Sequence, residues 1–404
     1  MIYMCLYTLG MLVITIQVGK RKRANIVTFI CAYYLFISVM SIVGERLGLQ
    51  SIQGIRLWPY VLILFSVSVL LFPYRGRQFD PNKIDYEISD PLLMVVVLCA
   101  LISNVIKITA LFSTARNLIS ANEWAHNRVA LYRGEITVIY SSNRIIQSIV
   151  VLGGYFTTAS LIVYFYLLTQ EKKPFLRISL LVSTIVATFL NAVIYSARGT
   201  LFNFLILLFG MYLFFKDGIT IELKRKLKLI LLLSLSVGTL FAVVVTASRF
   251  DSALYGKNSE LYSVIRYFGV SPITFSARVP ELDRFSFGAY AFDYLLASDF
   301  SASAVGVTWG SSFFTYLGWL YMDWGAVGII IFTILVFLLS NLLVRQSRYN
   351  FATIYYFFFF FEFMLQGALV IGRNYIYTLI AFVLQECAFI FLEHTRFGLR
   401  RINR

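Results

Sequence analysis

Long apolar stretches recur along almost the whole chain and constrain its fold more than any other feature. A helix needs about 20 mainly apolar residues to cross the roughly 30 Å hydrocarbon core of a bilayer. Eleven runs of about this size lie at residues 1–18, 26–43, 57–73, 91–112, 145–168, 176–195, 200–215, 229–247, 323–344, 351–371 and 375–392. Because exposed peptide groups find no hydrogen-bond partners in lipid, such runs cross it as helices. The sequence therefore predicts an all-α, polytopic integral membrane protein with about eleven transmembrane helices.

Charged residues predict the orientation of these helices. They make up only 14% of the chain, against about 25% in soluble domains, and cytoplasmic loops of membrane proteins are enriched in Lys and Arg. The run "KRKR" at 20–23 follows the first apolar run, which places the N-terminus outside and, by alternation, the C-terminus in the cytoplasm. The net charge of +15 then indicates topology and contact with anionic membrane lipids, and no nucleic acid is expected as a partner.

Two segments outside the membrane are long enough to carry structure of their own, and both are expected on the outer side. The first, at about 113–144, mixes polar and apolar residues in the manner of an interfacial amphipathic helix. The second, at 248–322, is rich in aromatic residues and is expected to form a compact cap on the membrane. The chain thus divides into eight spans at 1–247, the cap at 248–322, and three spans with a cytoplasmic tail at 323–404.

Arginine dominates the basic residues of the outer side. Its planar guanidinium stays charged and matches phosphate oxygens in a bidentate way. Three of these arginines, Arg198, Arg249 and Arg373, lie at the outer ends of predicted spans, where an unpaired charge is costly. For these three residues two hypotheses remain open: binding of a phosphorylated substrate, and structural pairing with an acidic residue.

The segment "ARVPELDRF" in the expected cap places two acids between two arginines. These are Arg278, Glu281, Asp283 and Arg284, and Pro280 fits the first position of a helix. On such a helix Glu281 and Arg284 lie one turn apart and can form a local ion pair. The alternative is a carboxylate held beside phosphate-binding arginines, where it takes a proton from a sugar hydroxyl. Both interpretations remain open for the cluster.

Other familiar kinds of site are missing from the sequence. The two histidines, His126 and His394, fall on opposite sides of the predicted membrane, and the four cysteines fall within predicted spans. Neither pattern has the spacing of a zinc site, and no nucleotide-binding motif or serine elbow occurs. No metal and no cofactor are therefore expected. A glycosyl donor would have to carry its own activation, as a lipid-linked pyrophosphate does.

With these features the chain resembles the Wzy-type polysaccharide repeat-unit polymerases, which include the O-antigen polymerases. The resemblance covers the overall layout and two local patterns. "YSARGTLFNFLILLFG" is similar to the turn of small residues and Arg that opens a span in that family. "FFTYLGWLYMDWGAVGIIIF" is similar to the aromatic and acidic stretch that follows the family's large periplasmic loop.

This resemblance implies a metal-independent glycosyltransferase of the bacterial inner membrane, which polymerises undecaprenyl-diphosphate-linked repeat units at the periplasmic face, with a chain-length regulator as a partner protein. The substrate pyrophosphate is then expected at Arg198, Arg249, Arg278, Arg284 and Arg373. Glu281 or Asp283 would be the catalytic base, and Asp323 is favoured as a helix N-cap. We expect at least two of Arg198, Arg249, Arg278 and Arg373 to point into one shared cavity. Glu281 or Asp283 is expected on the wall of that cavity.

Two other functions fit the same layout. An O-antigen ligase transfers the glycan to the lipid A core, and members of that group resemble one another in a histidine of the large loop, whereas segment 248–322 has none. A transporter or flippase of lipid-linked oligosaccharides often has internal repeats and ionisable residues at mid-membrane. No repeat is visible in this chain, and Lys107 is the one clear mid-span candidate.

Overall fold

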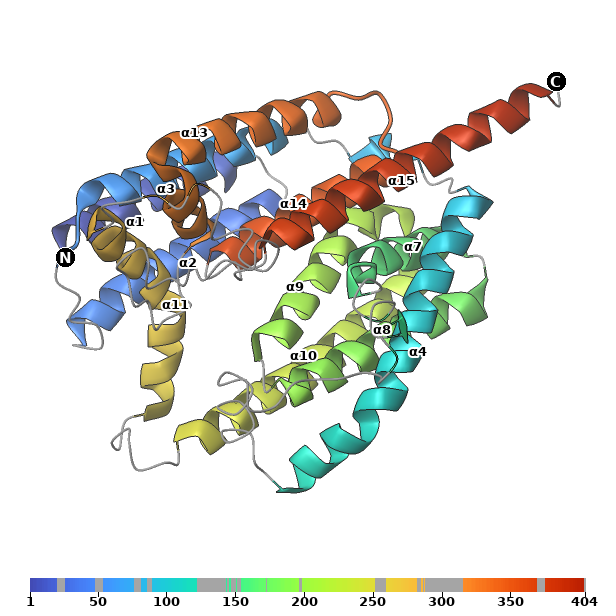
Figure 1. Ribbon diagram of the computed structural model, residues 1–404, viewed down its shortest axis with the longest axis horizontal. Helices are drawn as coiled ribbons and strands as arrows, with labels where there is room; N and C mark the ends of the chain where they lie inside the picture. The colour runs from blue at the N-terminus through green and yellow to red at the C-terminus, as the bar shows by residue number, and fades with distance from the viewer. Residues whose placement is uncertain are drawn as a thin grey trace. The chain divides into compact units, whose positions relative to one another are not determined.

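The computed structural model forms only helices as regular secondary structure in the residues that it describes, apart from a single bridge between Ile84 and Tyr349. It describes residues 1–19, 26–47, 54–75, 81–85, 89–121, 143, 145–146, 150, 154–171, 173–195, 198–250, 259–281, 285, 287, 315–368 and 375–402. The α-helices are α1 (Ile2–Gly19), α2 (Ile26–Arg46), α3 (Leu57–Leu71), α4 (Asp90–Ala121), α7 (Thr157–Thr169), α8 (Pro174–Ile194), α9 (Arg198–Phe215), α10 (Ile221–Phe250), α11 (Ser259–Arg278), α13 (Tyr316–Val344), α14 (Phe351–Gly367) and α15 (Tyr375–Ile402). Short 3-10 turns are η1 (Phe72–Tyr74), η3 (Pro81–Lys83), η4 (Lys216–Gly218) and η5 (Val279–Glu281) (Figure 1).

The expectation of a multi-pass, all-helical membrane protein agrees with these helices. Within the described residues, seven helical segments are long and apolar enough to cross a membrane: Ile2–Gly19, Ile26–Arg46, Leu57–Tyr74, Asp90–Ser120, Pro174–Ile194, Thr200–Gly218 and Leu320–Val344. The apolar helices α7 and α14 are shorter. Each of the eleven apolar runs contains a helix, although α7 covers only the second half of the run at 145–168.

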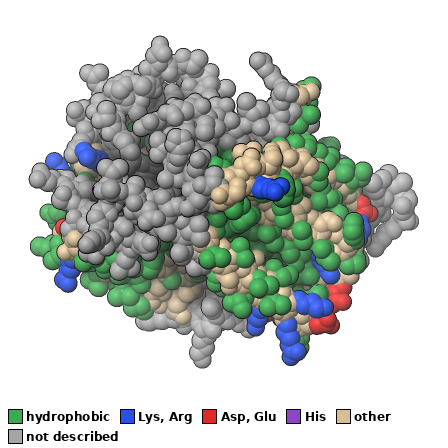
Figure 2. Space-filling model, turned by 90° about the horizontal axis from the view of Figure 1, so that it is seen from below, with side chains coloured by type: hydrophobic (Ala, Val, Ile, Leu, Met, Phe, Trp, Pro, Cys, Tyr) green, Lys and Arg blue, Asp and Glu red, His purple; other side chains and the backbone are tan. Residues whose placement is uncertain are grey.

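Hydrophobic side chains cover most of the described surface on the face drawn in Figure 2, and Lys and Arg gather there in small groups. Aliphatic side chains are also exposed on α13, where Val327, Leu335 and Leu342 each expose more than 60% of their surface. Large aliphatic side chains exposed along successive turns of one helix are suited to contact with lipid chains rather than with water.

The helices form two compact units whose segments alternate along the chain. Unit 1 consists of 1–83, 261–347 and 360–380, and unit 2 of 84–260, 348–359 and 381–404. The helix α14 is therefore divided, since its first half belongs to unit 2 and its second half to unit 1. These units are defined by which helices pack together. The predicted division at 1–247, 248–322 and 323–404 was instead based on position along the chain and relative to the membrane.

Buried hydroxyl groups join distant helices within unit 1. The Tyr34 hydroxyl on α2 donates to the carbonyl oxygen of Met364 at 2.9 Å, across 330 residues of sequence. On α3, Ser66 accepts a hydrogen bond from the Tyr316 hydroxyl at 2.8 Å and pairs with Thr333 at 2.9 Å. Because a buried hydroxyl without a partner is costly in an apolar environment, these bonds specify which faces of α2, α3, α13 and α14 meet.

In unit 2 the short helix α7 lies at the centre of the packing. Every residue of α7 from 158 to 168 is buried, and α7 contacts α4, α8 and α9. Its aromatic side chains stack on rings of the neighbouring segments, as Phe165 does on Phe215 with centroids 5.4 Å apart. A helix that is apolar on all sides is suited to such a central position.

The helix α13 breaks at Gly325, where φ is 65° and ψ is −164°. This region of backbone space is essentially restricted to glycine. The sequence predicted a span beginning at 323, whereas the helical chain already begins at Tyr316 and Gly325 separates a short first arm from the long second arm. The first arm is buried in unit 1, with Tyr316 and Leu317 almost fully covered.

Candidate functional site

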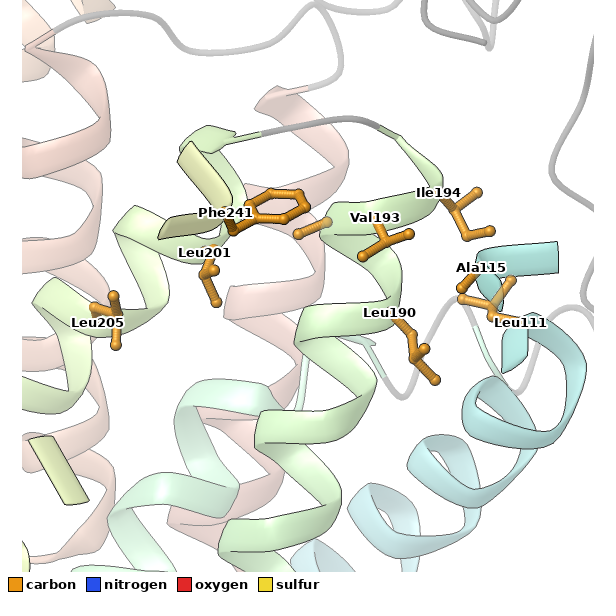
Figure 3. Packing of buried hydrophobic residues seen from close by; sticks show 9 residues of the cluster. Leu111, Ala115, Leu190, Val193, Ile194, Leu201, Leu205 and Phe241 are labelled. Carbon is orange, nitrogen blue, oxygen red and sulfur yellow. The ribbon is translucent and has the colours of Figure 1, made fainter. Parts of the chain in front are cut away.

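One end of unit 2 is built around a cluster of apolar side chains from four helices, which we call the α8–α9 cluster. Its members are Leu111, Ala115, Leu190, Ala192, Val193, Ile194, Leu201, Leu205 and Phe241. Figure 3 shows the end of α8 between α4 on one side and α9 with α10 on the other. The cluster fixes the last turn of α8 and the first turn of α9, and so determines where the connection between them lies.

The helix α9 begins at Arg198, as the sequence predicted for a span opening at this residue. The first turn of a helix leaves backbone N–H groups without intrahelical partners and carries a partial positive charge. Anions are therefore favoured at this position even before the arginine side chain is counted. The side chain of Arg198 itself lies outside the described residues.

The neighbouring helix α10 brings its own C-terminal turn to the same end of unit 2. The turn η4 connects α9 to α10, and a side chain at Gly238 would approach Leu205 to within 2.7 Å and Leu201 to within 3.6 Å. The two helices are therefore antiparallel, and the last turn of α10, which includes Arg249, extends beyond the start of α9. The side chain of Arg249 also lies outside the described residues.

The other predicted site residues belong to other parts of the chain. Arg278 is exposed and is the last residue of α11 in unit 1. The backbone of Glu281 lies in η5, and its side chain lies outside the described residues. Asp283, Arg284 and Arg373 lie wholly outside them. The predicted single cavity with one acid on its wall therefore stays a prediction.

Helix α11 belongs to the segment predicted as the outer cap, and its second half is held tightly within unit 1. The Ser41 hydroxyl of α2 donates to the carbonyl oxygen of Gly269 at 2.8 Å. The backbone N–H of Arg56 donates to the Ser276 hydroxyl at 3.1 Å. A Cβ at Gly269 would lie 2.6 Å from the carbonyl oxygen of Met40, so the two backbones are in direct contact. These contacts fix the position of the C-terminal end of α11.

Pro280 was expected to start a helix, and it lies instead in the 3-10 turn η5 that follows α11. The helix α11 continues through an internal proline, Pro272, and ends six residues later at Arg278. Since proline disfavours α-helical geometry in the residue before it, Pro280 accounts for the end of α11 immediately before Val279. The segment "RVPELDR" therefore starts at the last residue of α11 and, within the described residues, continues into η5.

Aromatic side chains surround the break in α13. The Tyr321 ring lies 5.5 Å from Trp58 and 5.7 Å from Phe285 between ring centroids. Phe287 donates its backbone N–H to the carbonyl oxygen of Asp323 at 2.9 Å, and the Asp323 side chain is fully buried. Partly exposed Trp and Tyr rings are typical of the membrane–water interface, so this arrangement places the break near such an interface.

A polar network that the sequence interpretation missed joins α4, α7 and α8 in unit 2. The Asn104 amide donates to the hydroxyls of Ser183 and Thr184, both at 3.2 Å, and Thr184 pairs with Ser160 at 3.4 Å. A signal was present in the sequence, because Asn104 and Lys107 lie one helical turn apart within a predicted span. The network and Lys107 occupy the same face of α4.

Within the described residues, no group of three or more His, Cys, Asp or Glu side chains is arranged to hold a metal ion. Comparison of the chain with models of protein families, with curated proteins and with solved structures found no match.

Proposed function

We propose that this protein is a membrane-embedded glycosyltransferase that polymerises lipid-linked oligosaccharide repeat units. The observation that carries the proposal is that two arginine positions occur at the same end of the antiparallel helices α9 and α10 of unit 2. There α9 begins at Arg198 and the last turn of α10 contains Arg249. A helix start and two cations next to an apolar bundle suit a lipid pyrophosphate, whose charge binds at the helix end while its chain stays in lipid.

The proposed reaction transfers a growing glycan from its lipid pyrophosphate to a sugar hydroxyl of a new repeat unit. The bond between the anomeric carbon and the pyrophosphate oxygen breaks, and a bond from that carbon to the acceptor oxygen forms. The pyrophosphate departs with the bonding electrons, and the arginines stabilise its developing charge. The proton of the acceptor hydroxyl passes to a carboxylate, for which Glu281 or Asp283 is proposed.

The proposal includes eleven spans, a periplasmic N-terminus and a cytoplasmic C-terminus in a bacterial inner membrane. Cysteine labelling tests this topology. A cysteine at Ser252 or Ser286 should react with an impermeant thiol reagent added to intact cells, and a cysteine at Ser347 should react only after permeabilisation. Labelling of position 347 in intact cells would contradict the proposed orientation.

A gene deletion in the host distinguishes the proposed polymerase from its two rivals. Loss of a polymerase leaves surface glycan with single repeat units, whereas loss of a ligase leaves polymerised glycan on the carrier lipid. Loss of a flippase leaves single repeat units on the carrier lipid at the cytoplasmic face. The glycan ladder on a gel and the carrier-linked products by mass spectrometry separate these three outcomes.

Complementation of the deletion then tests the arginine site. We expect Arg198→Ala to restore no ladder although the protein is inserted normally, and Arg198→Lys to restore it in part, because a point charge does not reproduce a bidentate contact. Arg116, an exposed residue on α4, provides the matched control, and Arg116→Ala should restore the full ladder. A full ladder with Arg198→Ala would refute the role of this residue.

A further inference from the structure

Lys107 places a positive charge on the interior face of a membrane helix. Buried residues of α4 recur at Ala100, Ser103, Asn104 and Leu111, and Lys107 continues this stripe at helical spacing. The opposite face, with Ile102, Val105 and Phe112, is exposed. The Lys107 side chain is half-buried and belongs to the face that packs within unit 2.

A glycine makes room for the lysine head group. The Lys107 Nζ atom lies 3.0 Å from the position that a Cβ on Gly154 would occupy. One turn earlier on α4, the Ser103 hydroxyl donates to the carbonyl oxygen of Val150 at 3.2 Å. These two contacts hold the segment before α7 against α4 and leave the ammonium beside a residue without a side chain.

Lys107 has no counter-charge within the described part of the chain. Among the residues that the structure describes, Lys107 forms no ion pair and no hydrogen bond. The adjoining network of Ser103, Asn104, Ser160 and Thr184 is neutral, and its hydrogen bonds are directed to one another and to backbone carbonyls. Burying an ammonium group in a membrane span costs free energy unless an anion pairs with it. An anionic ligand would therefore be stabilised at this position.

The height of Lys107 suits a lipid phosphate. At 1.5 Å per residue it lies about 25 Å along α4 from Asp90. In the apolar run predicted to span the membrane at 91–112, Lys107 lies five residues before the outer end, and α4 itself continues to Ala121. Leu111, one turn further along α4, belongs to the α8–α9 cluster on which α9 starts. Lys107 is thus one turn below the cluster that positions Arg198.

We propose that Lys107, seated against Gly154, is a phosphate-binding site of unit 2 that takes the phosphate of a membrane lipid. If the chain acts as a polymerase, this lipid is a polyprenyl phosphate. That identification rests on the proposed function. The site itself rests on the placement of Lys107 alone. Its ammonium donates up to three hydrogen bonds to phosphate oxygens, and the apolar α8–α9 cluster begins one turn further along α4, at Leu111.

Binding measurements on the purified full-length protein in phosphatidylcholine nanodiscs test the site. Three probes are used: a polyprenyl phosphate, phosphatidylglycerol and inorganic pyrophosphate. We expect Lys107→Met to weaken binding of the polyprenyl phosphate at least tenfold, which is the loss expected for a hydrogen bond to a charged group. Lys107→Arg should retain part of the affinity. Lys226→Met, which removes an exposed lysine, should leave it within twofold of the wild type.

Gly154→Ala tests the same contact without removing the charge. The added methyl group would displace the ammonium, so binding should weaken, whereas Gly19→Ala should have no effect because nothing lies within 4 Å of that position. Equal loss with all three probes would assign the site to phosphate in general, and loss with the two lipids alone would assign it to lipid phosphates. Unchanged binding by both Lys107→Met and Gly154→Ala would overturn the proposal.

The outcomes separate this proposal from the proposed function. If the gene deletion leaves the glycan ladder intact but Lys107→Met still loses phosphate binding, the polymerase proposal fails and the phosphate site stands. If Arg198→Ala abolishes the ladder but Lys107→Met binds all three probes normally, the polymerase proposal stands and the Lys107 site fails.

Discussion

Replacement of Gly269 by alanine should destabilise unit 1 strongly, because α11 and α2 touch there through their backbones. The new Cβ would lie 2.6 Å from the carbonyl oxygen of Met40 and 2.9 Å from the backbone nitrogen of Ser41. Neither atom is the end of a flexible side chain, so α11 must move away from α2 by several tenths of an ångström. Small residues at such crossings are what permits close approach of membrane helices.

The magnitude follows from two separate losses. Inserting a methyl group into a packed interface costs about 1–3 kcal/mol. The shift also breaks or lengthens the 2.8 Å hydrogen bond from the Ser41 hydroxyl to the Gly269 carbonyl oxygen, which contributes about 1 kcal/mol. We therefore expect Gly269→Ala to lower the free energy of unfolding by about 2–4 kcal/mol. Ser41→Ala, which removes the hydroxyl that donates to the carbonyl oxygens of Gly269 and Ile37 without adding a clash, should lower it by about 1 kcal/mol.

Unfolding in mixed micelles of mild detergent and SDS, followed by tryptophan fluorescence, measures this difference. Gly19→Ala is the matched control, since no atom lies within 4 Å of the added methyl group, and it should be neutral or slightly stabilising. The same shift should displace the end of α11 at Arg278. Surface substitutions usually change the free energy of unfolding by no more than about 0.5 kcal/mol. If the free energies of unfolding of Gly269→Ala and Gly19→Ala differ by no more than this, the backbone contact is not formed.

Three further substitutions test other parts of the structure. Gly325→Ala should lower the free energy of unfolding by about 1–3 kcal/mol, because the break in α13 requires a positive φ and the Phe285 ring lies 2.8 Å from the new Cβ; stability equal to the wild type would exclude the break. Asn104→Val should cost about 1 kcal/mol in the same assay, because it removes both amide bonds to α8, and no change would mean that these bonds are not formed. Lys226 donates to Glu222 at 2.6 Å and lowers the pKa of that carboxyl group, so Lys226→Met should raise it in a ¹³C NMR titration. The stabilisation from this pair is present above the unfolded pKa of Glu222 and is lost as the pH falls, and an unchanged titration curve would show that the pair does not form.

The helices themselves could be predicted because transfer into lipid depends mainly on apolar length. Every predicted run contains a helix, and α9 begins at Arg198 as expected. The burial of α11 could not be predicted in this way, since its polar and aromatic composition resembles that of a surface segment. What holds it is the close approach at Gly269 and the pairing of Ser276 with residue 56. Such contacts depend on partners more than 200 residues away.

For the candidate site, sequence patterns located the helix ends but not the neighbours of each charge. Arg198 at a helix start follows from the change between polar turn and apolar run, and this signal is local. The room beside Lys107 depends on Gly154, which is distant in sequence and belongs to another segment. The polar network around Asn104 likewise depends on residues of α7 and α8. A single sequence has no local signal for such pairings.

The hydrogen bond from Tyr34 to Met364 has a consequence for biosynthesis. The ribosome completes α2 about 330 residues before the acceptor exists, and at 5–20 residues per second this interval lasts roughly 15–65 s. Ser66 is likewise synthesised about 250 residues before its hydrogen-bond partners Tyr316 and Thr333. During that time the first three helices are in the membrane with hydroxyl groups that have no permanent partner. A nascent chain that stops before Tyr316 therefore cannot form these hydrogen bonds of unit 1.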